Sequence, residues 1–139
     1  MSLNPIAQQI YHSGVTVDLT DCFFVFDYYR NPAGSSQDFA SQFAGKNEVF
    51  VFVSHHHFDH FNREIFDWQK YTSRIHYILS SDINLKQKQD NYYFMKKGEK
   101  LRIKDITVNT LGSTGEKPLI NRDSEQITLK ISENRVKQT

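Results

Sequence analysis

Histidines are concentrated in one short stretch of this chain, His55-His56-His57-Phe58-Asp59-His60. Four of the six histidines of the protein fall within it. Imidazole nitrogens and carboxylate oxygens are ligands of zinc and of other divalent metal ions. The stretch directly follows the apolar run Val49–Ser54, which is typical of a buried strand. These residue types, at the end of such a strand, predict a metal site; a chance run of surface histidines is the alternative.

The spacing of the candidate ligands divides them into two pairs. Residues i and i+2 of an extended segment point to the same side, so His55 and His57 can converge on one ion. Asp59 and His60 lie where the chain turns toward the next element, and they can bind a second ion. Two ions about 3.5–4 Å apart can hold a bridging hydroxide. We therefore expect up to two divalent ions, with zinc favoured over manganese or iron.

The elements around this motif are mostly strands. Val15, Val17 and Leu19 alternate with polar residues, which predicts a half-buried strand, and Cys22–Phe26 reads as a buried one. Asn62 is a good N-cap for a short helix. Further strands are expected at 10–12, 75–79, 92–95 and 127–131, a hairpin at 101–108, a short helix around Phe39 and Phe43, a loop at 112–118 and a frayed end at 132–139. The pattern indicates a sheet-dominated α/β or α+β fold.

Composition narrows the classes of function. The chain has 139 residues, enough for one domain, and its 17 basic and 16 acidic residues give a net charge of +1. This balance argues against a nucleic-acid partner or an anionic membrane. Several lysines between Lys86 and Lys100 are interpreted as a solvated face. The single cysteine, Cys22, excludes an internal disulfide, and neither a signal peptide nor a membrane helix is evident. We expect a cytoplasmic protein that acts on a small-molecule substrate.

The segment Ser54–His60 resembles the metallo-β-lactamase superfamily, whose hallmark is His-x-His-x-Asp-His after a strand. Flanking segments support the resemblance: 11–14 is similar to the opening hairpin of that family, 24–29 to its second strand, and 79–83 and 110–114 to later segments of a lactonase-like bacterial branch. The resemblance covers about residues 10–114, and 115–139 is a divergent tail.

The resemblance implies a fold, a site and an activity. The fold would be the first half of an αβ/βα sandwich. His55 and His57 would ligate the first metal, and Asp59 and His60 the second. Asp59 would also orient a metal-bound hydroxide that attacks an ester, lactone or phosphoester-like substrate, which makes the chain a metal-dependent hydrolase. Asp27 would be either a hydrogen-bond partner of a ligand histidine or a turn residue at a strand end.

The same resemblance is incomplete in the second half of the chain. The family takes a third histidine, a bridging aspartate and a last histidine from there, whereas no histidine or cysteine follows His76 here and the surroundings of Asp123 do not match. We therefore expect residues 1–139 to form one truncated domain. A second copy in a homodimer, packed on an exposed sheet face, or a complementary second-half chain would complete the site. A non-catalytic half-domain that binds a metal or a partner is the alternative.

Overall fold

Strands from the first two thirds of the chain build a six-stranded sheet in the order β1-β2-β3-β4-β5-β6. Their bounds are β1 Ile6–Gln9, β2 Val15–Asp18, β3 Cys22–Phe26, β4 Glu48–Val53, β5 Ile75–Ser80 and β6 Tyr92–Met95. The first three strands pair antiparallel, and β3 to β6 pair parallel. Strands covered on both faces read as continuous apolar runs, and every residue of β3 and β4 is buried.

The computed structural model describes residues 6–9, 14–19, 21–29, 34–54, 62–96, 98–109, 119–122, 127–132 and 135–138. The predicted strand at 10–12 and the predicted loop at 112–118 lie outside these ranges.

The later strands form a second sheet of five strands, all antiparallel, in the order β11-β10-β9-β8-β7. Their bounds are β7 Lys100–Ile103, β8 Ile106–Asn109, β9 Leu119–Arg122, β10 Ile127–Ser132 and β11 Arg135–Gln138. The prediction that 132–139 frays is wrong for β11, which pairs with β10. A polar segment can still form a strand where a neighbouring strand satisfies its backbone groups.

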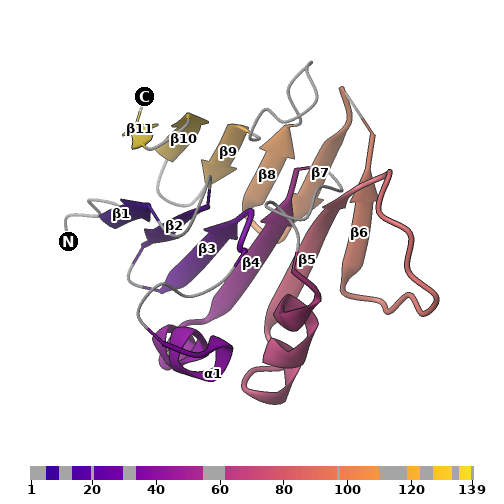
Figure 1. Ribbon diagram of the computed structural model, residues 1–139. Helices are drawn as coiled ribbons and strands as arrows, with labels where there is room; N and C mark the ends of the chain where they lie inside the picture. Colours follow the sequence, from indigo (N-terminus) through magenta and orange to yellow (C-terminus); the bar gives the residue numbers. More distant parts are fainter. Residues whose placement is uncertain are drawn as a thin grey trace.

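Short helices cover one face of the six-stranded sheet (Figure 1). They are α1 Ser36–Ala40, which continues into the 3-10 turn η1 Ser41–Phe43, and the 3-10 helix η2 Arg63–Lys70. A capping box at Ser35 begins α1, and the Asn62 side chain caps η2 as predicted. Phe39 and Phe43 are both buried against the sheet, so the predicted helix face is confirmed.

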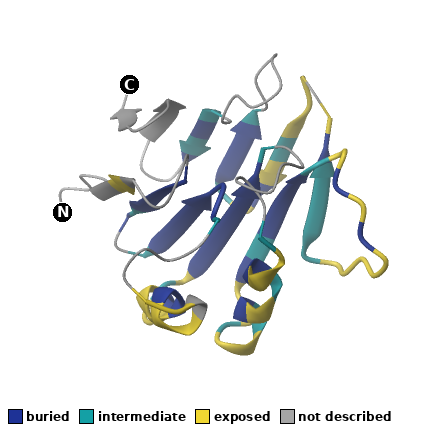
Figure 2. Ribbon diagram, in the orientation of Figure 1, coloured by how far each residue is buried: buried dark blue, intermediate teal, exposed yellow. Residues whose placement is uncertain are grey.

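Side chains along the central strands point alternately to the two faces of the sheet and so form two separate apolar cores. In β3, Phe23 and Val25 pack toward the helices, whereas Phe24 and Phe26 pack toward the second sheet. The result is three layers, a helical layer and two sheets, with the buried strands in the middle (Figure 2). The sheet-dominated, mixed α+β class that the sequence predicts is confirmed.

One detail differs from the predictions. The alternation in β2 predicts one wet face, but Thr16 is only 3% exposed, because both faces of β2 are covered. In β7, the side chains that point away from the core are Lys100 and Arg102. Among the described residues, Tyr71 is the one large hydrophobic side chain that is exposed, at 47%. Homodimer formation stays a prediction.

Candidate metal centre

The predicted ligands His55, His57, Asp59 and His60 all lie outside the described residues, but both ends of the segment that carries them are described. Ser54 follows β4 directly, and Asn62 opens η2. Among the residues that the structure does describe, no three His, Cys, Asp or Glu side chains come together so that they could hold a metal ion. The site must therefore be built from what fixes the two ends of the segment.

Asp27 fixes the first end. Its Oδ1 accepts a hydrogen bond from the backbone N–H of Ser54 at 2.7 Å, and its Oδ2 accepts one from the Ser54 hydroxyl at 2.8 Å. The backbone N–H of Asp27 donates to the carbonyl of Phe52 at 2.9 Å. Asp27 is 1% exposed and has a φ of 54°, a left-handed conformation that aspartate tolerates better than most residues. Charge-assisted bonds in a buried site hold Ser54 firmly against the end of β3.

Asn62 fixes the second end. Its side-chain amide donates to the carbonyl of Tyr29 at 2.5 Å, while its Oδ1 caps η2 by accepting from the N–H of Glu64 at 2.9 Å. Asp27 and Tyr29 belong to the same short segment that follows β3. Both ends of residues 55–61 are thus tied to the carboxyl end of one buried strand.

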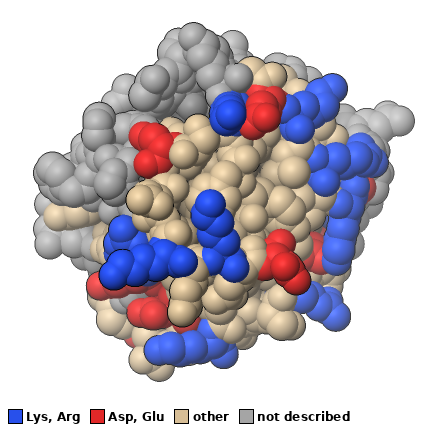
Figure 3. Space-filling model, turned by 90° about the vertical axis from the view of Figure 1, so that its right-hand side faces the viewer, with Lys and Arg blue, Asp and Glu red and all other residues tan. Residues whose placement is uncertain are grey.

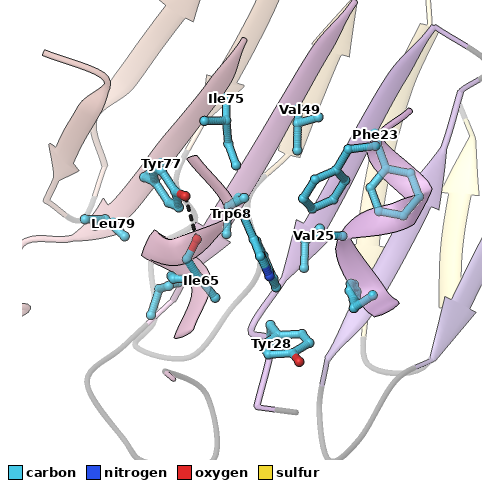
Figure 4. Packing of buried hydrophobic residues seen from close by; sticks show 14 of the residues in the cluster. Phe23, Val25, Tyr28, Val49, Ile65, Trp68, Ile75, Tyr77 and Leu79 are labelled. Carbon is cyan, nitrogen blue, oxygen red and sulfur yellow. Dashed lines mark hydrogen bonds between the residues drawn. The ribbon is translucent and has the colours of Figure 1, made fainter. Parts of the chain in front are cut away.

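An aromatic cluster packs against Tyr28, the middle residue of that short segment (Figure 4). The ring of Tyr28 packs edge-to-face on Phe39 and on Trp68, with 4.8 Å between ring centroids in each case. Phe39 and Trp68 stack on each other at 5.2 Å. Because Trp68 belongs to η2 and Phe39 to α1, the cluster joins the segment after β3 to both helices. A binding loop between such supports starts and ends on rigid elements.

The candidate ligands, three imidazoles and a carboxylate, are a donor set that suits a divalent ion. In sequence they follow the carboxyl end of the parallel strand β4, the edge where open parallel sheets place their ligands. The residues available to hold the ion are His55, His57, Asp59 and His60. Asp27 lies in the turn at the end of β3, and its carboxylate accepts hydrogen bonds from Ser54, the residue before His55.

Sequence reasoning did not foresee a second charged cluster, at the opposite end of β4. The carboxylate of Glu48 contacts His76 Nε2 at 2.6 Å and also pairs with Lys104 from the second sheet. His76 stacks on Phe50. These contacts join the two sheets.

A second ion pair crosses between the sheets at the same end. Arg122 of β9 donates two hydrogen bonds to the Asp21 carboxylate, at 2.8 and 2.6 Å. The guanidinium holds the pKa of Asp21 below its usual value of 3.8. The partners are far apart in sequence, so no local pattern could have revealed either pair.

Comparisons with known proteins give solved structures of similar fold. No family model matches the chain, and no curated protein matches its sequence. Among solved structures, CmlA, a diiron beta-hydroxylase from Streptomyces venezuelae, is similar with a TM-score of 0.54 and 16% identity, over 88% of this chain and 28% of that one. A point mutant of CmlA beta-hydroxylase gives a TM-score of 0.53 and 16% identity, over 87% and 29%.

This chain therefore spans less than a third of the length of the chains that it resembles. Within the described residues, no helix is long and apolar enough to cross a membrane. The likeness, at this level of identity, concerns the fold alone. The fold is mixed α+β, dominated by its sheets, and metallo-β-lactamase-like.

Proposed function

We propose that this chain carries the metal-binding loop of a metal-dependent hydrolase of metallo-β-lactamase type. The observation that carries the proposal is that residues 55–61, rich in ligand-type side chains, lie between Ser54 and Asn62, which both bond to the segment after β3. Fixing the two flanking residues in advance lowers the ordering cost of binding an ion between them. The solved structures support a fold on which metal chemistry is carried out, since one of them is named as a diiron enzyme.

In this proposal His55 and His57 bind one ion, and Asp59 and His60 bind a second. Asp27 acts through Ser54 by setting the direction in which the loop leaves β4. When bound, divalent ions would lower the pKa of water and polarise a substrate oxygen. The residues of the loop would hold the ions, and Asp59 would also orient the attacking water.

The substrate we propose is a small molecule with an ester, lactone or phosphoester-like bond. Lactones follow from the similarity of segments 79–83 and 110–114 to the lactonase-like branch. Zinc is the first metal to test, and iron the second, because the similar solved structure is named as a diiron protein. A cytoplasmic location belongs to the proposal, supported by the single, buried thiol of Cys22.

A partner chain completes the proposed site. Two protein ligands per ion are fewer than the three or more that zinc sites usually have. A second copy of this chain or a complementary second-half chain would supply the others. If neither does, the alternative function is a half-domain that binds metal or a partner without turnover.

Metal titration of untagged protein tests the ligand assignment. Competition with a chromogenic chelator should show tight zinc binding to the wild type and at least about tenfold weaker binding to His57→Ala. His56→Ala is the matched control, because His56 stands beside the ligands but has no ligand role, and its affinity should equal that of the wild type. Equal losses in both variants would reject the assignment.

Turnover distinguishes the two functions. The metal-loaded protein should hydrolyse at least one member of a panel of p-nitrophenyl esters, aromatic lactones and phosphodiesters, and Asp59→Ala should abolish that activity. Tight metal binding with no turnover on any of these would support the non-catalytic half-domain instead.

A further inference from the structure

The outer edge of β6 offers unpaired backbone groups. Tyr77 N–H donates to the carbonyl of Asn91 and Ser81 N–H to that of Met95, both at 2.9 Å, so the odd-numbered residues of this stretch face β5. Tyr92 and Phe94 therefore direct their backbone groups outward, because directions alternate along a strand. No described strand pairs with β6 on that side. The Tyr92 N–H donates to the carbonyl of Gln89, so no described strand pairs with the Tyr92 carbonyl or with either backbone group of Phe94.

Cationic side chains surround this edge. Exposed basic residues between positions 82 and 102 outnumber the acidic ones, five to three, over the described residues. The basic ones are Lys86, Lys88, Lys96, Lys100 and Arg102, and the acidic ones are Asp82, Asp90 and Glu99. Figure 3 faces this side and shows blue side chains around a tan surface, with red side chains interspersed among them.

We propose that the edge of β6 binds an acidic, extended segment of a partner protein, which adds to the sheet as a seventh strand. Backbone hydrogen bonds to Phe94 would supply affinity, as in other strand-addition complexes. The lysines would select acidic side chains through electrostatic complementarity.

The aromatic residues of β6 favour a peptide over single-stranded nucleic acid, which needs open ring faces for stacking. The ammonium of Lys88 lies 5.1 Å from the ring centroid of Phe94. The ring of Tyr92 already packs on Phe66 at 5.0 Å and on Tyr77 at 5.3 Å. These rings therefore already pack against other side chains of the fold, whereas no described strand pairs with the outer edge of β6.

Binding of a synthetic peptide tests this proposal. A fluorescent peptide of alternating glutamate and valine should bind the full chain and slow hydrogen exchange at the Phe94 amide, as measured by NMR. A lysine–valine peptide and a single-stranded oligonucleotide of equal length should bind at least about tenfold more weakly. Failure of the acidic peptide to bind, equal binding of either competitor, or an unchanged Phe94 amide would overturn the proposal and leave the lysines as protection against aggregation at a sheet edge.

A pair of charge-matched variants separates local complementarity from net charge. Lys86→Gln with Lys88→Gln should weaken the acidic peptide about threefold to tenfold, the range for two exposed ion pairs. Gln37→Glu on α1 with Gln42→Glu on η1 changes the net charge by the same amount and should change the Kd less than about twofold. Equal effects of both pairs would show that only net charge attracts the peptide, and would reject a site at β6.

Discussion

Replacing Asp27 should loosen the end of β4 without disturbing the rest of the fold. Asp27→Ala removes two hydrogen bonds, to the N–H and to the hydroxyl of Ser54, from a carboxylate that is 1% exposed. Bonds to a charged group contribute about 1.5–3 kcal/mol each, and alanine at a φ of 54° costs about 1–2 kcal/mol more. Because these terms are not additive, we expect a loss of about 3–5 kcal/mol in the free energy of unfolding.

Asp27→Asn is the sharper variant. The amide oxygen can still accept from the N–H of Ser54, asparagine tolerates the left-handed conformation, and the serine hydroxyl can turn to accept from the amide. The loss should be about 1–2 kcal/mol. If Asp27 helps to position the candidate ligands by holding Ser54, zinc affinity should fall about tenfold to a hundredfold. Losses of this size are typical when a residue that orients a metal ligand is replaced.

Urea denaturation followed by circular dichroism gives the stabilities, and Ser54→Ala closes a double-mutant cycle with Asp27→Asn. A coupling energy of about 1 kcal/mol is expected for two side chains in direct contact. A coupling near zero would mean that the bond between them contributes nothing. Unchanged zinc affinity in Asp27→Asn would refute the link between this pair and the metal loop.

Three further predictions concern the core and the contacts between the sheets. Tyr77→Phe removes a buried hydroxyl that donates to the carbonyl of Ile65 at 2.5 Å, and it should lower stability by about 1–3 kcal/mol in urea; a loss below about 0.5 kcal/mol would contradict the contact. Asp21→Asn should destabilise the protein at pH 7 by about 1–3 kcal/mol. The pKa of Asp21 is lowered in the folded state, so the ionised carboxylate stabilises the fold fully above the unfolded pKa of 3.8. This stabilisation is lost as the pH falls through the lower, folded-state pKa. The melting temperatures of wild type and variant should therefore converge in acid. Burial raises the pKa of the Cys22 thiol from 9.0 to about 11, so iodoacetamide at pH 8 should modify it about a hundredfold more slowly in the native protein than in urea; equal rates would show that the thiol is accessible.

Much of the local structure could be predicted from the sequence. The continuous apolar run Cys22–Phe26 and the short segment Tyr92–Met95 are strands with those bounds, and the hairpin turns at Lys104. Asn62 caps η2 as predicted, because its side-chain oxygen accepts a hydrogen bond from the N–H of Glu64. In each case the signal is carried by residues close together in the chain, where burial patterns and caps act.

What the sequence did not reveal depends on contacts between distant residues. Asp27 and Ser54 are 27 positions apart, and Asp21 and Arg122 are 101 apart. The sequence marked Asp27 as a residue of interest, but only the parallel register of β3 and β4 brings it beside Ser54. Likewise, the burial of Thr16 and the pairing of β11 are consequences of neighbouring strands rather than of their own residues.

The candidate metal ligands are a prediction from residue types and spacing, and the structure describes only the two residues that flank them, Ser54 and Asn62. The most direct measurement is the metal content per chain, by elemental mass spectrometry on untagged protein, together with the molar mass from light scattering. We expect between one and two divalent ions per chain, with two ions per chain in a dimer if a second copy completes the site. Metal-free protein that takes up no zinc, manganese or iron on incubation would contradict it.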